Sequence, residues 1–201
     1  LEDFLTHGIF TSEHNQHFAR LLLENVHILH QHGYTHRDIK SNNLFVYTHK
    51  ATQTICIGDY GLCSMDNAEA RKSSVYNEYT YWPPEMQKES DLLVDNKLVD
   101  SWGVGKCILE CFCNGHTHGH KIENSVQVQA WCERHLNFPF ENKILWTEVL
   151  TGLLNTDPNE RLSISDAYDK VKSKDTITGR LLFFVVDGRR HTCLLYTSDA
   201  A

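Results

Sequence analysis

The sequence lacks the features that mark membrane, secreted, repetitive or nucleic-acid-binding proteins. Its longest apolar run, Leu181–Val186, is too short to cross a bilayer, and its first residues, LEDFL, do not form a signal peptide. It has no internal repeat and no low-complexity block. The net charge of −7 includes no basic stripe, which disfavours a nucleic-acid partner. We therefore expect a globular intracellular protein, in the cytoplasm or, for a viral source, in the host cytoplasm or nucleus.

The cysteines give no disulfide pattern. There are 7 of them in 201 residues, an odd number scattered mostly through apolar stretches, as expected for reduced thiols in an intracellular protein. One segment, residues 111–120, combines two cysteines with three histidines, all of which can bind zinc. Because these ligands are crowded at short range, we interpret the segment as a helix end with two core cysteines followed by a polar turn, with a zinc site as the alternative.

Apolar periodicity predicts a mainly helical chain. Helices are expected over residues 13–32, 97–113, 122–134, 143–154 and 165–172, the last beginning with a capping pattern from Ser163 to Asp166. Residues 44–46 and 54–57 read as two short strands of a hairpin, and residues 1–8 read as the end of a preceding helix. The irregular stretch from 62 to 81 is long enough to predict a functional loop.

The sequence HRDIKSNN at residues 36–43 carries the most informative chemistry. It places the carboxylate of Asp38, the ammonium of Lys40 and the amide of Asn43 on one short loop. Phosphoryl transfer requires these groups, because a carboxylate orients the attacking hydroxyl, a cation offsets phosphate charge and an oxygen ligand holds a metal. The loop therefore predicts a phosphotransferase.

This loop resembles the H-R-D-x-K-x-x-N catalytic loop of eukaryotic-type protein kinases. Four later segments resemble further kinase motifs in the correct order: IGDYGL at 57–62 (D-F-G), YWPPE at 81–85 (Y-x-A-P-E), DSWGVG at 100–105 (D-x-W-S-x-G) and DPNER at 157–161 (D-P-x-x-R). The departures are Tyr60 for Phe, Pro83 for Ala and Gly103 for Ser, the last expected to add flexibility near a helix start. The resemblance covers about residues 1–172 and implies an α+β protein kinase-like fold, represented here mainly by the α-helical C-terminal lobe with a small β hairpin.

The resemblance implies roles for four residues in catalysis and cofactor binding. Asp38 would be the catalytic carboxylate, and Lys40 would contact the γ-phosphate of ATP, as in Ser/Thr-specific kinases. Asn43 and Asp59 would hold Mg²⁺. Gly61 would let the backbone turn beside Asp59. The implied partners are ATP and a protein substrate.

Other matched residues are implied to be structural or regulatory. His36 would pack beneath Asp59, and Asp100 would accept amide hydrogens from the catalytic loop. Glu85 and Arg161 would form a buried ion pair. Arg37 would pair with a phosphate on the loop after Asp59, for which the available acceptors are Ser73, Ser74, Tyr76, Tyr79 and Thr80.

The predicted organisation has three parts. Residues 1–175 form the kinase C-terminal lobe, 176–192 are a following segment without an assignment, and 193–201 read as a translated sequencing adaptor. No G-x-G-x-x-G motif occurs in the chain, so we expect the N-terminal lobe to be missing and these residues alone to be inactive. The alternatives are a catalytically impaired pseudokinase that acts as a scaffold, and a kinase-like small-molecule phosphotransferase. The oligomeric state stays open.

Overall fold

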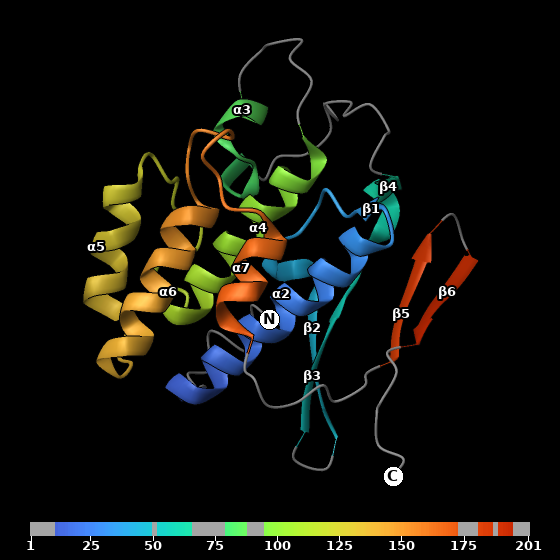
Figure 1. Ribbon diagram of the computed structural model, residues 1–201, viewed down its shortest axis with the longest axis horizontal. Helices are drawn as coiled ribbons and strands as arrows, with labels where there is room; N and C mark the ends of the chain where they lie inside the picture. The colour runs from blue at the N-terminus through green and yellow to red at the C-terminus, as the bar shows by residue number, and fades with distance from the viewer. Residues whose placement is uncertain are drawn as a thin grey trace.

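The computed structural model describes residues 11–49, 52–65, 79–87, 95–172, 181–186 and 189–194. Helices surround a small β element, as the sequence predicts (Figure 1). The α-helices are α2 (Ser12–Gln31), α3 (Pro84–Gln87), α4 (Asn96–Phe112), α5 (Ser125–His135), α6 (Phe140–Leu153) and α7 (Ile164–Val171). The strands are β1 (Tyr34–Thr35), β2 (Leu44–His49), β3 (Thr52–Ile57), β4 (Ser64–Met65), β5 (Leu181–Val186) and β6 (Arg189–Leu194), and the 3-10 helices are η1 (Ser41–Asn43), η2 (Tyr60–Leu62) and η3 (Tyr79–Tyr81).

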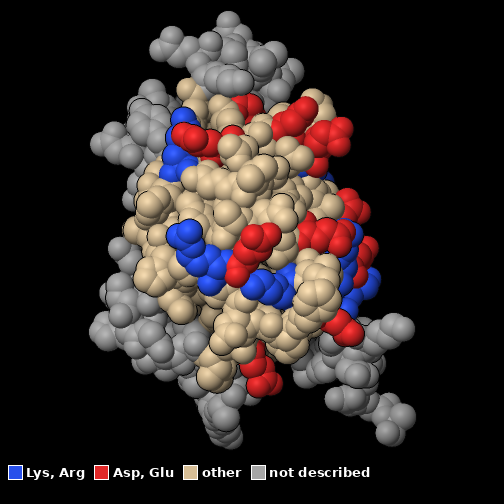
Figure 2. All heavy atoms as spheres, turned by 90° about the vertical axis from the view of Figure 1, so that its left-hand side faces the viewer, with Lys and Arg blue, Asp and Glu red and all other residues tan. Residues whose placement is uncertain are grey.

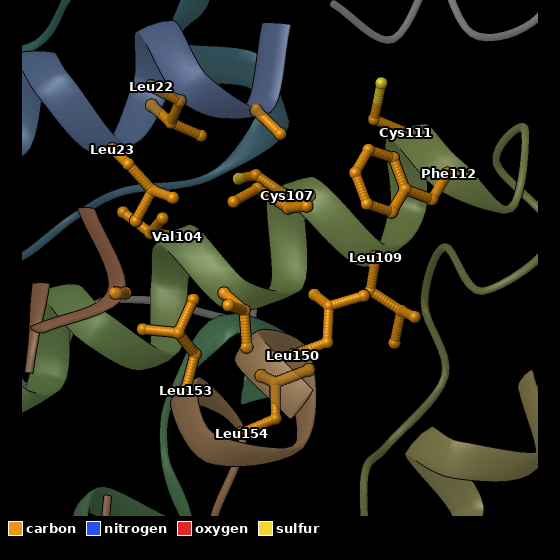
Figure 3. Close-up of a cluster of buried hydrophobic side chains, with 14 of the residues drawn as sticks. Leu22, Leu23, Val104, Cys107, Leu109, Cys111, Phe112, Leu150, Leu153 and Leu154 are labelled. Carbon is orange, nitrogen blue, oxygen red and sulfur yellow. The ribbon is translucent and has the colours of Figure 1, made fainter. Parts of the chain in front are cut away.

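Helix α4 lies at the centre of the core. It is almost completely buried because α2, α6 and α7 pack against it. Figure 3 shows Leu22 and Leu23 of α2 on one side of α4, and Leu150 and Leu153 of α6 on the other. Each of these four residues is 0% exposed, and the burial of one leucine side chain contributes about 1.5–3 kcal/mol to stability. The core therefore holds α4 as a fixed platform for the loops around it.

Local signals set the helix ends close to their predicted positions. The side chain of Ser163 accepts a hydrogen bond from the amide of Asp166 at the start of α7, and the Asp166 carboxylate accepts one from the Ser163 hydroxyl. This confirms the predicted capping pattern. The helix end expected over residues 1–8 lies outside the described residues, as do the phosphate acceptors Ser73, Ser74 and Tyr76.

The β hairpin is longer than predicted. Strands β2 and β3 pair antiparallel from Leu44↔Ile57 to His49↔Thr52, so residues assigned to the turn belong to the ladder. Threonine and tyrosine in this stretch favour extended backbone, which allows the pairing to continue. A further antiparallel pair joins β5 to β6, from Leu181↔Leu194 to Val186↔Arg189. The register of β2 and β3 pairs Leu44 with Ile57 and so brings residues 43 and 58 to the same end of the hairpin. The segments that carry Asp38 and Asp59 therefore lie at that end.

The outer face of α5 and α6 is mixed in character. It exposes the side chains of Val126, Phe140 and Ile144, and Lys and Arg are interspersed there with Asp and Glu (Figure 2). In the part of the chain that the structure describes, no helix is long and apolar enough to span a membrane.

The cysteines of the core are free thiols. The structure describes the side chains of six of the seven, and none of these six forms a disulfide. Burial raises the pKa of Cys132 to about 11 and that of Cys113 to about 12, so both thiols are neutral at physiological pH. Between residues 111 and 120, as elsewhere in the described chain, no three His, Cys, Asp or Glu side chains cluster as a metal site.

Candidate active site

The catalytic loop is held from below by one buried carboxylate. Asp100, in the second turn of α4, accepts hydrogen bonds from the amide of His36 at 2.8 Å and the amide of Arg37 at 2.7 Å. The ring of His30 lies 2.8 Å from the same carboxylate. Asp100 is 1% exposed, so these bonds form in a low-dielectric interior where they are strong. Arg37 has a φ of 69°, a left-handed conformation that this anchoring sustains.

Three polar side chains of the loop contact one another. The Asn43 side-chain nitrogen donates to the backbone oxygen of Asp38 at 2.8 Å and to its carboxylate at 3.0 Å. The Lys40 ammonium lies 3.2 Å from the same carboxylate oxygen. Because the nitrogen of Asn43 makes both bonds, its amide oxygen is the atom that can coordinate a metal. The loop thus presents an oriented carboxylate, a cation and an oxygen ligand together.

The hairpin brings Asp59 to this loop. The Gly58 amide donates to the backbone oxygen of Asn43 at 2.8 Å, and the His36 ring donates through Nε2 to the Gly58 oxygen at 3.1 Å. His36 therefore supports the segment that carries Asp59, and its ring also packs edge-on against the ring of Tyr60. Burial lowers the pKa of His36, and its two hydrogen bonds, to Gly58 and from the Asp38 amide, fit the neutral ring.

Asp59 has a strained backbone and an exposed side chain. Its φ of 58° and ψ of 71° are left-handed, and its carboxylate accepts a hydrogen bond from the Gly61 amide at 3.3 Å. A Cβ at Gly61 would lie 3.2 Å from the Asp59 carboxylate, which is tighter than an ordinary contact. Glycine at 61 thus leaves room for the turn, as the sequence suggested.

The expected ion pair between distant motifs is present. The Arg161 guanidinium contacts both oxygens of Glu85, at 2.6 and 2.8 Å. It also donates to the backbone oxygens of Leu98 and Asn155 and lies 5.1 Å from the centre of the Trp102 ring. This bidentate pair ties the start of α3 to α4 and to the segment before α7.

Gly103 does not provide the flexibility expected of it. It lies inside α4, where a Cβ would stand 2.7 Å from the backbone oxygen of Ile39. Glycine is therefore needed for a close approach between α4 and the loop residue that separates Asp38 from Lys40. The helix is packed tightly at this point, so the small residue serves packing rather than motion.

Sequence reasoning missed several buried polar residues around the site. His30 belongs to none of the recognised motifs, and its ring lies at hydrogen-bond distance from Asp100, 70 residues further along the chain. Ser41, Tyr81, Lys106 and Glu110 form a connected polar group beneath the loop. The one signal in the sequence was the pair of charges at 106 and 110, which interrupts the apolar run of α4.

Fold and site together define a phosphotransferase-like C-terminal lobe, and comparisons name its family. The chain belongs to the protein kinase family, because the family model described as "Protein kinase domain" matches residues 1–171. Serine/threonine-protein kinase WNK4 of Homo sapiens is 30% identical over 156 residues, and dual specificity protein kinase Ttk of Danio rerio is 30% identical over 163 residues. These matches cover 75% and 76% of this chain but only 12% and 16% of those proteins.

A solved structure supports the same fold. The protein titled "ROP2 from Toxoplasma gondii: A virulence factor with a protein-kinase fold and no enzymatic activity" superposes with a TM-score of 0.56 at 22% identity. The superposition covers 85% of this chain and 48% of that chain. The predicted protein kinase-like fold, represented by a mainly helical lobe with a small β element, is thereby confirmed.

Proposed function

We propose that the protein containing this chain transfers the γ-phosphate of ATP to Ser or Thr hydroxyls of protein substrates. The observation that carries the proposal is the convergence of Asp38, Lys40 and Asn43 with Asp59 through the bond between Gly58 and Asn43. Two separate segments thereby supply a base, a cation and two oxygen ligands to one place. The resemblance to WNK4, described as a serine/threonine-protein kinase, supports the choice of substrate hydroxyl.

The roles follow from the contacts. Asp38 orients the substrate hydroxyl and accepts its proton, with its carboxylate held by Asn43 and Lys40. Lys40 lies close enough to share its charge between Asp38 and the transferred phosphate. The loop is rigid because Asp100 binds its backbone, so these groups need little reorganisation during the reaction.

The oxygen ligands fit magnesium. The amide oxygen of Asn43 and the carboxylate of Asp59 are hard donors of the kind that Mg²⁺ prefers. When bound, the metal would offset charge on the phosphate oxygens. Phe45, which is 49% exposed and packs on Gly58 beside Asp59, offers an apolar face to the nucleotide base.

Arg37 has a regulatory role in this proposal. It directly precedes Asp38 and would pair with a phosphate added to the segment between β4 and α3. Thr80 is a described acceptor there, and Tyr79 is another. Phosphatase treatment of the active full-length protein should lower its activity, whereas unchanged activity would remove this role.

The second candidate is a pseudokinase that binds partners without transferring phosphate. It is favoured by the fold similarity to ROP2, whose title states that it has no enzymatic activity. The presence of Asp38, Lys40, Asn43 and Asp59 favours the active alternative.

Phosphate transfer by the full-length protein distinguishes the two candidates. With ATP, Mg²⁺ and a mixed Ser/Thr/Tyr peptide library, we expect phosphorylated Ser or Thr from the wild type. Asp38→Asn should reduce kcat by about 10²–10⁴-fold, the usual contribution of a general base. Full activity in that variant would contradict the role of Asp38, and nucleotide binding without any transfer by the wild type would support the pseudokinase.

A further inference from the structure

Two opposite charges are buried in the second half of α4. Lys106 and Glu110 are one helical turn apart, their side chains are 0% exposed, and the ammonium lies 3.8 Å from Oε1 of the carboxylate. Burying a charge is costly unless it is paired and hydrogen-bonded. Because neither residue contacts Asp38 or Asp59 in the described contacts, their cost is not explained by the proposed chemistry itself.

Glu110 connects two segments of the active site. Its Oε2 accepts hydrogen bonds from the hydroxyls of Ser41, at 2.5 Å, and Tyr81, at 2.6 Å. The two hydroxyl oxygens are 2.7 Å apart. Ser41 directly follows Lys40 in the catalytic loop, and Tyr81 begins the YWPPE segment at residues 81–85. One carboxylate oxygen therefore joins the loop to the segment that ends at Glu85.

Lys106 provides the charge that this arrangement requires. Its ammonium donates to the backbone oxygen of His120 at 2.9 Å and lies 5.8 Å from the centre of the Tyr81 ring. Burial lowers the pKa of Lys106, and the nearby carboxylate of Glu110 opposes this shift. Oε1 of Glu110 has no hydrogen-bond partner among the described residues and faces the Lys106 ammonium at 3.8 Å, while Oε2 also lies 3.6 Å from Nδ1 of His118. Hydrogen bonds to an ionised carboxylate are about twice as strong as neutral ones.

We propose that Glu110, paired with Lys106, is a positioning residue that fixes the catalytic loop against residues 81–85 through Ser41 and Tyr81. This inference rests on the proposed function. Glu110 does not touch the reacting groups; it acts through Ser41 on the neighbouring Lys40. The Tyr81 hydroxyl, whose pKa is raised chiefly by burial, stays protonated and so remains a donor to Glu110.

The test compares single hydroxyl deletions in the full-length protein. Ser41→Ala and Tyr81→Phe each remove one donor to Glu110. The matched control Ser101→Ala removes a buried hydroxyl whose one hydrogen bond among the described residues is to the backbone oxygen of Lys97 in α4. We expect the first two variants to lower kcat about 10-fold and to leave the KM for ATP unchanged. This is less than the roughly 10²-fold loss that a misplacement of about 1 Å can cause. The control should keep the wild-type kcat.

Combination and charge variants complete the experiment. Because both hydroxyls act through one carboxylate, the double variant of Ser41→Ala and Tyr81→Phe should be no slower than the worse single variant. Glu110→Gln should lower kcat similarly, and adding Lys106→Met should restore its thermal stability by removing the unpaired ammonium. If Glu110→Gln does not fold, the two hydroxyl variants still decide the question.

The outcomes separate this inference from the proposed function. A wild-type kcat in Ser41→Ala and Tyr81→Phe, in a protein that Asp38→Asn inactivates, would overturn the positioning role and leave the proposed function standing. Equal losses in Ser101→Ala would also overturn it, since any buried hydroxyl would then have the same effect. A wild-type protein without phosphotransfer would overturn both.

Discussion

Removing one partner of the ion pair between Arg161 and Glu85 should strongly destabilise this lobe. We consider replacement of Arg161 by methionine, which keeps much of the side-chain volume and removes the charge and all its donors. The guanidinium is 0% exposed and Glu85 is 14% exposed, so the pair lies in the interior. The variant leaves a carboxylate without its cation and removes the Arg161 donor from the backbone oxygens of Leu98 and Asn155.

The expected loss is about 3–5 kcal/mol, the usual cost of removing one partner of a buried pair. This loss is a large part of the free energy of unfolding of a typical domain, which is roughly 5–15 kcal/mol. A matched control exists on the surface, where Lys170 and Glu148 also lie 2.6 Å apart but are 39% and 59% exposed. Lys170→Met should cost at most about 1 kcal/mol, because water screens exposed pairs. The same atomic separation thus predicts different energies at the two sites.

Urea unfolding of the 201-residue chain measures both losses. Tryptophan fluorescence is a suitable signal, because Trp102 and Trp146 are buried in the folded state and become exposed on unfolding. Glu85→Gln and the double variant complete a thermodynamic cycle, in which the double variant should lose less free energy than the sum of the single variants. A loss for Arg161→Met no larger than that for Lys170→Met, or an additive cycle, would refute the argument from burial.

Three further predictions concern pH, packing and thiol reactivity. The pKa of His36 is lowered in the folded state, so the unfolded chain binds more protons below about pH 6.5. The free energy of unfolding should therefore fall as the pH drops below about 6.5. His36→Asn should reduce the dependence of this free energy on pH by up to about 1.4 kcal/mol per pH unit. An unchanged dependence, measured by urea unfolding at several pH values, would contradict this. Gly103→Ala should destabilise the chain by about 1–3 kcal/mol, because the added methyl group clashes with the backbone, less a gain in helix propensity of up to about 1 kcal/mol. Gly105→Ala should cost less, because its methyl group meets side-chain atoms of leucines. Equal unfolding midpoints for the two variants would contradict this. An aromatic disulfide reagent should modify the exposed Cys56 before the four buried thiols, as peptide mapping would show. Equal rates of modification would contradict this.

The helices could be predicted from the sequence because their signals are local. Apolar spacing predicted helices over residues 13–32 and 97–113, and α2 (Ser12–Gln31) and α4 (Asn96–Phe112) begin and end within one residue of these bounds. The strand lengths were less certain from local patterns, since β2 and β3 extend into stretches that were assigned to the turn. Pairing between strands decides where a ladder ends, and a single strand carries little information about it.

The residue types of the candidate site could be predicted, and so could some of its supports, such as Asp100. The motif around Asp38 and the one around Asp59 could be recognised because catalytic groups occur at fixed short spacings. The bond between Gly58 and Asn43 that brings them together follows from the hairpin register. His30 and Glu110 could not be assigned, because their partners lie 70 and 69 residues away along the chain.

By itself, the sequence determined that the chain is a mainly helical protein kinase lobe with a carboxylate, a cation and two oxygen ligands in ordered motifs. These properties depend on residue identity and short spacing. Only the tertiary structure decided which further side chains hold those groups in place: His30 beside Asp100, Gly103 against Ile39, and Glu110 between Ser41 and Tyr81. The physical reason is that a buried polar group is stable only beside a specific partner, and long-range packing of the chain places that partner.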